Sequence, residues 1–190
     1  MIHNPYMKAI IIVHGKSEKT LCEYIKSNLR LNIHIASEKK GQCSIQITSL
    51  KSFLNRIEYK SLKDFLREFK DELPENIKKL PENFKIFTIM DKDDCTDEQK
   101  KNYIDKTMFK KHWAYEYIHP IYNIENLEDV MRKSGVNITS KKDYIKIFPI
   151  NNNGDAKDTE QIEKLLSELK KNKKITNIHE FFEFCLDLTK

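Results

Sequence analysis

Short apolar runs and amphipathic stretches alternate along much of the chain. The runs Lys8–Val13 and Phe84–Met90 are mostly apolar and rich in β-branched residues, as is typical of strands that are buried on both faces of a sheet. After the first run, Leu21, Ile25 and Leu29 recur at every fourth position, which marks the buried stripe of a helix. The pattern therefore predicts buried strands of a mostly parallel sheet, with helices packed against it.

Weaker patterns predict the other elements. Ser17 is expected to cap the first helix, and Thr96 with Gln99 forms a capping box for a later one. Pro120 indicates that its strand lies at a sheet edge. The remaining predicted strands are Asn32–Ala36, 115–122 and Tyr144–Phe148. The remaining predicted helices are Ser44–Ile57, Ser61–Glu72, one from about Asp97, Asn126–Lys133 and two after residue 156. This alternation predicts an α/β fold with an open, Rossmann-like sheet.

Composition limits the class of protein. The 190 residues predict one α/β domain over residues 1–150, with C-terminal helices over 151–190 packed on the same domain. No apolar run approaches the ~20 residues that span a bilayer, and the four cysteines form no Cys-x-x-Cys pair, so we expect a cytoplasmic protein with reduced thiols and no membrane contact. The four glycines form no phosphate-binding loop, so any ATPase would be a separate subunit.

Polar residues follow both of the strongest predicted strands, at residues 14–18 and 91–94. The carboxyl ends of parallel strands meet at one edge of a sheet, so we expect these segments to lie together. Asp91, Asp93 and Asp94 supply the oxygen ligands that Mg²⁺ and Mn²⁺ prefer. Such ions orient an attacking water and neutralise a phosphodiester transition state.

A helix N-terminus also favours acidic residues, which is the alternative interpretation of the aspartates and of Glu18. Thr96 already supplies a cap for the later helix, and Asp97 and Glu98 already occupy its first turn. The additional aspartates therefore exceed what capping requires, and the sequence favours a metal site.

The two motifs together resemble the topoisomerase–primase (TOPRIM) domain, which pairs a Glu-Gly turn after its first strand with an Asp-x-Asp after a later one. The stretch Val-His-Gly-Lys-Ser-Glu at residues 13–18 looks most like the OLD-family and related phage-defence nucleases, which show Val-Glu-Gly-x-Thr/Ser-Glu. The resemblance covers about residues 8–130. It implies a TOPRIM fold, a nuclease that uses Mg²⁺ or Mn²⁺ in phage defence or RNA processing, and site roles for Glu18 and Asp91.

One departure from the family concerns His14, which stands where these nucleases have their main glutamate. Imidazole can bind Mn²⁺ and act as a general base, but Mg²⁺ prefers oxygen ligands. Either the metal site is altered and Glu18 takes a larger share, or catalysis is lost and the domain binds nucleic acid or a partner protein. His14 could also be a packed, hydrogen-bonded residue.

Two further residues are candidates by the same resemblance. The segment 122–128 looks like an Ile-Glu-Asn stretch of these nucleases, which makes Glu125 a candidate metal ligand; the alternative is a helix N-terminal acid. Glu128 and Asp129 are expected on the solvated face of that helix. Lys157 could reach a scissile phosphate, as a basic residue does in some relatives, or be a solvated loop residue.

Lysines could frame the acidic site and contact DNA or RNA. The net charge of +5 is a mild indication of a polyanionic partner. Lysines and aromatic residues are interleaved over residues 100–115, where lysines could neutralise phosphates and aromatic rings could stack on bases; the alternative is that the rings are buried against the sheet. The candidate nucleic-acid contacts are Lys16, Lys39, Lys40, Lys110 and Lys111.

Two questions stay open at this point. A response-regulator-like receiver, in which the acids hold Mg²⁺ and one accepts phosphate, is a third hypothesis; it is less favoured because the acids follow the TOPRIM order. The apolar faces of the C-terminal helices could complete the layer over the sheet or bury against a second copy in a homodimer.

Overall fold

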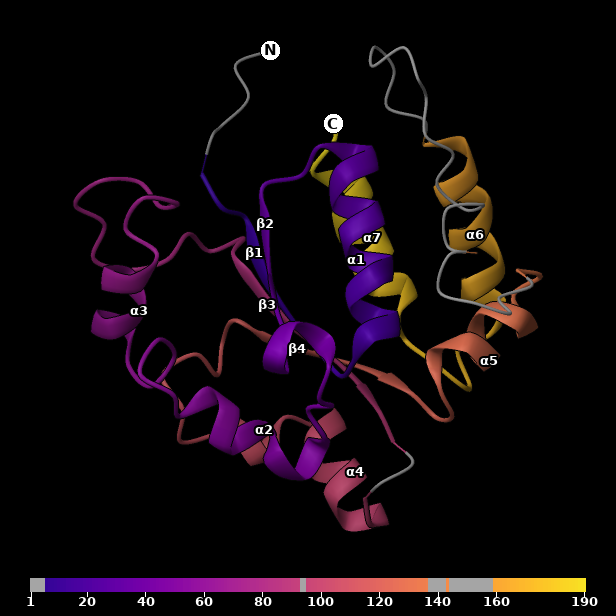
Figure 1. The fold of residues 1–190 in the computed structure, drawn as a ribbon, viewed down its shortest axis with the longest axis horizontal. Helices are drawn as coiled ribbons and strands as arrows, with labels where there is room; N and C mark the ends of the chain where they lie inside the picture. Colours follow the sequence, from indigo (N-terminus) through magenta and orange to yellow (C-terminus); the bar gives the residue numbers. More distant parts are fainter. Residues whose placement is uncertain (1–5, 93–94, 137–142, 144–158) are drawn as a thin grey trace.

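A four-stranded parallel sheet forms the centre of the protein (Figure 1). The structure, a computed structural model, describes residues 6–92, 95–136, 143 and 159–190. The strand order is β2-β1-β3-β4. This confirms the α/β class and the parallel sheet. The strands are β1 (Ala9–Val13), β2 (Ile33–Ala36), β3 (Lys85–Asp91) and β4 (Ile118–Asn123).

Helices cover both faces of this sheet (Figure 1). On one face lie α1 (Lys16–Leu29), α5 (Leu127–Lys133), α6 (Glu160–Lys171) and α7 (His179–Asp187). On the other lie α2 (Ile47–Leu54), α3 (Leu62–Glu68) and α4 (Asp97–Ile104). The short 3-10 helices are η1 (Glu38–Gly41) and η2 (Thr107–Phe109). The C-terminal helices α6 and α7 share one apolar core with α1 and the sheet.

Strand β1 shows why its sequence is apolar at every position. Its side chains alternate between the two faces of the sheet, so Ala9, Ile11 and Val13 join one core while Ile10 and Ile12 join the other. All five are fully buried. Burying a branched side chain of this kind contributes roughly 1.5–3 kcal/mol, so β1 anchors both layers.

Several boundaries differ from the sequence-based expectation. Helix α2 begins later than predicted, because Ile45 N–H is still bonded to His14 O (2.7 Å) at the end of β1. Helix α3 begins directly after its cap Ser61, which accepts from Asp64 N–H, and it ends at Glu68, before the predicted end at Glu72. The connection between β2 and α2 contains η1, in which Lys39 and Lys40 have φ angles of 44° and 59°. The predicted strand Tyr144–Phe148 lies outside the described residues.

The edge strand β4 is protected along its open side. Pro120 has no N–H to donate, and the side-chain amide of Asn177 occupies the groups beside it: Tyr122 N–H donates to Asn177 Oδ1 (2.8 Å), and Asn177 Nδ2 donates to Pro120 O (2.9 Å). Ile124 N–H then donates to Ile175 O (2.8 Å). The segment before α7 therefore closes this edge of the sheet, as the position of Pro120 indicated.

Replacing Asn177 by Ala tests this closure. The change leaves a donor and an acceptor of β4 without their amide partner, which should lower the free energy of unfolding by about 1–3 kcal/mol. Urea denaturation followed by circular dichroism measures the loss. The matched control is Gln42→Ala, which removes an exposed loop amide and should change stability by less than about 0.5 kcal/mol; equal losses in the two variants would contradict the role of Asn177.

Candidate active site

His14 joins the turn after β1 to two other segments through hydrogen bonds. Its N–H donates to Ile89 O (2.8 Å), which extends the β1–β3 ladder beyond the end of β1. Its imidazole Nδ1 lies 3.0 Å from Ile45 O, and because a carbonyl oxygen only accepts, Nδ1 is the protonated ring nitrogen. His14 therefore joins β3 and the segment before α2, so the packed, hydrogen-bonded interpretation of this residue is supported by its contacts.

Glu18 is a buried residue in the first turn of α1. Gly15 is the N-cap residue of the helix, and its N–H donates to Glu18 Oε2 at 2.9 Å. The carboxylate thus accepts a hydrogen bond at the positive end of the helix dipole, although Glu18 is only 2% exposed. Ser17 was expected to be the cap, and that prediction is wrong: the helix already includes Lys16, and the Ser17 hydroxyl donates elsewhere.

Asp91 ends β3 and is also buried, with 8% of its surface exposed. Asn123 Nδ2, at the end of β4, donates to Asp91 Oδ1 (3.0 Å). Asn123 Oδ1 in turn accepts from the Thr176 hydroxyl (2.9 Å), which itself accepts from Ile178 N–H (3.0 Å). A chain of hydrogen bonds thus orients the Asp91 carboxylate from the next strand and from the segment before α7.

The strand register places these two acids at the same edge of the sheet. Val13 of β1 pairs with Ile89 of β3, so Gly15 and Asp91 lie two residues beyond a paired position on neighbouring strands, which are ~4.8 Å apart. Glu18 is bonded to Gly15. The prediction that the polar segments after β1 and β3 lie at one edge is therefore confirmed by the topology.

Glu128 of α5, and not Glu125, contacts the first turn of α1. Glu128 is half-buried and accepts a hydrogen bond from the Ser17 hydroxyl, which joins α5 to the first turn of α1. The expectation that Glu128 lies on a solvated face is therefore wrong. Glu125, the candidate ligand, is exposed and pairs with Lys133 (3.1 Å). Asp129 pairs with Arg132 (2.7 Å) on the same helix.

Lys92 is a basic residue at this edge that the sequence analysis did not select. Its Nζ lies 4.5 Å from the centre of the Tyr122 ring, and burial lowers the pKa of its ammonium group, to which the charge of Lys100 adds. Because side chains alternate along β3, Lys92 is directed to the face opposite Asp91.

Two titratable groups that interact with these acids, Cys22 with Glu18 and Tyr103 with Asp91, are neutral at pH 7. Burial raises the pKa of the Cys22 thiol, and the charges of Cys185 and Glu18 raise it further. Burial likewise raises the pKa of Tyr103, with a smaller contribution from Asp91. Both groups therefore stay protonated at pH 7.

The donor chemistry of the edge suits a hard divalent cation, because two buried carboxylates supply oxygen ligands. Within the described part of the chain, however, no three or more His, Cys, Asp or Glu residues are grouped so that they could hold a metal ion. Asp93, Asp94 and Lys157 lie outside the described residues. Glu18 and Asp91 are thus the predicted ligands that the structure places at the edge.

The candidate nucleic-acid lysines fall into two groups. Lys39 and Lys40 are exposed in the turn that ends at Gly41, and this turn packs on the start of α1, where a Cβ atom added to Gly41 would lie 3.4 Å from Lys16 Cα. A separate hollow of about 430 Å³ is lined by Lys110 and Lys111, together with Lys51, Leu54, Asn55, Thr107, Met108, Phe109 and His112. The structure thus brings Lys16, Lys39 and Lys40 together and keeps the other pair apart from them.

The aromatic residues near Lys110 and Lys111 are mainly structural. Tyr103 and Phe109 are buried against the sheet, and Trp113 Nε1 donates to Tyr59 O (2.6 Å). Tyr115 lies beneath Lys106, whose Nζ is 4.7 Å from the ring centre. The interpretation that these rings pack against the sheet is therefore supported over base stacking.

Comparisons with known proteins add no relative: no protein-family model, curated protein or solved structure matches the chain. In the described part of the chain, no helix is both long and apolar enough to cross a membrane.

The hydroxyl of Thr176 should be essential to the chain of bonds that reaches Asp91. Thr176→Val keeps the shape of the side chain but leaves Asn123 Oδ1 and Ile178 N–H without a partner inside the protein. We expect the free energy of unfolding to fall by about 1–3 kcal/mol, measured by urea denaturation. Thr48→Val, on the exposed face of α2, is the control and should be nearly neutral; an unchanged stability of the Thr176 variant would show that the network does not hold Asp91.

Proposed function

We propose that the protein is a divalent-metal-dependent nuclease of TOPRIM type, which hydrolyses phosphodiester bonds of DNA or RNA in the cytoplasm. The observation that supports this proposal most directly is the pair of buried carboxylates, Glu18 and Asp91, at the ends of neighbouring parallel strands. Carboxylate oxygens are the ligands that a hard divalent cation prefers. Their placement agrees with the order of acids that the TOPRIM resemblance implies.

In this proposal Glu18 and Asp91 hold Mg²⁺ or Mn²⁺, and Asp93 and Asp94 supply further oxygen ligands. A bound metal of this kind activates water and neutralises negative charge on the phosphate. Glu125, the other candidate ligand, is exposed and paired with Lys133, whereas Glu128 accepts a hydrogen bond from the Ser17 hydroxyl at the start of α1.

The chain's own residues also support a polyanionic substrate. Lys16, at the start of α1, and Lys39 and Lys40, in the turn packed on it, are exposed. Lys16 is the first residue of α1, and the turn that holds Lys39 and Lys40 packs on it, so a phosphate backbone bound by these lysines would pass close to the first turn of α1. Lys110 and Lys111 would contact a more distant part of a long substrate.

A second candidate function is binding of nucleic acid without cleavage. It is favoured by the contacts of His14, because the imidazole stands where the family's glutamate is expected and its Nδ1–H is bonded to Ile45 O. In this form of the proposal the edge binds a metal ion and a polyanion, and no phosphodiester bond is broken.

Removing the charge of the two acids tests the first proposal. Purified protein is incubated with plasmid DNA, linear DNA, single-stranded DNA and RNA in Mg²⁺ or Mn²⁺, beside the variants Asp91→Asn and Glu18→Gln. Each variant keeps an oxygen that can accept the present hydrogen bond but loses the charge that a metal requires. We expect cleavage to fall at least about 100-fold in each, in keeping with the cost of disturbing metal-site residues.

The control for this experiment is Asp97→Asn, which removes a fully exposed acid at the start of α4 and should cleave at the wild-type rate. Cleavage that persists in Asp91→Asn and Glu18→Gln would refute the proposed site.

Thermal denaturation with and without Mn²⁺ separates the two candidate functions. Under the second, Mn²⁺ raises the midpoint of the wild-type protein but not of Asp91→Asn, because a ligand that binds only the folded state stabilises it, while no substrate is cleaved. A wild-type protein that neither cleaves nor responds to Mn²⁺ would overturn both.

A further inference from the structure

The two edge strands of the sheet differ in whether another segment covers their open side. The open side of β4 is closed by Pro120, Asn177 and the segment at Ile175. The opposite edge strand, β2, is bonded to β1 on one side, and within the described residues no other strand joins it. In a parallel pair alternate residues of a strand bond the neighbour, so every second peptide group of β2 faces away from β1. Such an edge is a template for a further strand.

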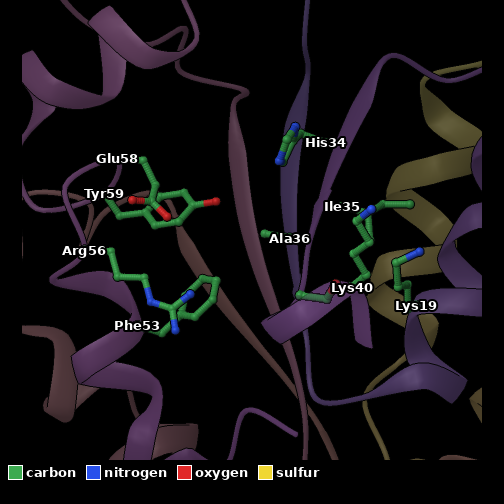
Figure 2. Close-up of a pocket in the computed structure, with 10 residues that line it drawn as sticks. Lys19, His34, Ile35, Ala36, Lys40, Phe53, Arg56, Glu58 and Tyr59 are labelled. Carbon is green, nitrogen blue, oxygen red and sulfur yellow. The ribbon is translucent and has the colours of Figure 1, made fainter. Parts of the chain in front are cut away.

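A groove of about 290 Å³ runs along this edge (Figure 2). Its floor is formed by the second half of β2 and by Ser37. One wall comes from α2 and the connection after it, through Phe53, Arg56 and Tyr59, and the other comes from α1 and η1, through Lys19 and Lys40. The edge of β2 therefore lies between two walls.

The aromatic side chains of one wall are already packed against each other in the absence of a ligand. Phe53 and Tyr59 are both about 95% buried and stack with ring centres 5.5 Å apart. The Arg56 guanidinium lies 4.3 Å from the centre of the Phe53 ring and also pairs with Glu38. A wall that is already packed requires little ordering on binding, which lowers the entropic cost of association.

The side chains that line the groove carry more positive than negative charge. Its lining contains three permanent cations, Lys19, Lys40 and Arg56, against one carboxylate, Glu58. His34 also lines it, and burial lowers the pKa of its imidazole, so it is neutral at pH 7. Lys19 and Arg56 are paired with Glu23 and Glu38, whereas no described residue forms an ion pair with Lys40.

We propose that the β2 edge is a docking site for an extended acidic segment of a partner protein, which adds a fifth strand to the sheet. The segment's backbone bonds the outward peptide groups of β2, and its acidic side chains face Lys40, Lys19 and Arg56. This is strand addition, in which main-chain bonds supply affinity and side chains supply selectivity.

Two other occupants fit the groove less well. The β2 edge of a second copy carries the same two walls, and these would meet the walls of the first copy before the edges could pair. The phosphates of single-stranded nucleic acid would form ion pairs with the lysines, but its backbone has no row of amide donors and carbonyl acceptors to match those of β2. The docking site is therefore distinct from the acids at the carboxyl edge of the sheet, and it does not depend on the proposed nuclease activity.

Synthetic peptides test the proposal on the full-length protein. The probe is a fluorescein-labelled decapeptide of alternating Glu and Val, and its affinity is measured by fluorescence anisotropy against the matching Lys–Val decapeptide and a ten-nucleotide oligouridylate. We expect the Glu–Val peptide to bind at least about tenfold more tightly than the Lys–Val peptide. We also expect Lys40→Glu to weaken it by about threefold to fivefold, as loss of an exposed ion pair would.

Backbone methylation then separates strand addition from simple charge attraction. Two forms of the Glu–Val peptide carry N-methyl groups on alternate residues, in one register or the other. Only one register removes the N–H groups that face β2, so one form should lose at least about tenfold in affinity, the cost of lost hydrogen bonds, while the other binds normally. Amide hydrogen exchange should slow within residues 33–37 when the unmethylated peptide is added.

Two control variants test whether any loss of peptide binding is specific to the β2 edge. Lys101→Glu changes an exposed lysine on α4 and should leave binding unchanged, and Asp91→Asn should bind the peptide like wild type even if every nuclease assay fails. The proposal is overturned if the Glu–Val peptide does not bind, if both methylated forms bind equally, or if the oligouridylate binds more tightly than the peptide. It is also overturned if sedimentation shows a dimer that Lys40→Glu dissociates.

Discussion

The parallel pairing of β1 with β3 is the constraint on which the rest of the structure depends. These strands carry the most buried stretches of the chain, and their ladder continues beyond β1 through the bond from His14 N–H to Ile89 O. The pairing fixes where both strands end, and therefore where Glu18 and Asp91 lie relative to each other. Helices on both faces then stabilise this alignment by burying alternate side chains of the same strands.

Glu18 has a structural role at the start of α1, and under the proposed function it is also a metal ligand. One oxygen accepts from Gly15 N–H and so completes the start of α1, a contribution of about 0.5–2 kcal/mol for a capping interaction. The same carboxylate lies at the edge where a cation would be bound. Asp91 differs, because its orientation is set from other elements, through Asn123 and Thr176. The two acids are thus positioned independently, one by its own helix and one by the strand next to its own.

The sequence predicted the features that depend on local periodicity and missed those that depend on distant contacts. The apolar runs of β1 and β3 are readable because these strands are buried on both faces, and the stripe of α1 because every fourth residue is buried. The edge position of Pro120 is readable because proline has no N–H to donate to a neighbouring strand. The hydrogen bond between Ser17 and Glu128 joins residues 111 positions apart, so no local sequence pattern predicts it. Helix α2 begins late for a similar reason, since Ile45 is held by His14 across 31 positions. Asn123 and Thr176 carry no local signal for their roles.

The turn over the start of α1 has a consequence for how this sequence can change over evolutionary time. Lys39 and Lys40 occupy left-handed backbone conformations just before Gly41, at a cost of roughly 1–2 kcal/mol for each residue with a side chain. Glycine at either position would relieve that cost. A lineage that retains lysine there is giving up folding free energy in order to keep positive charge on the surface. The amino acids found at these two positions in diverging copies of the gene would therefore record whether selection acts on charge or on stability.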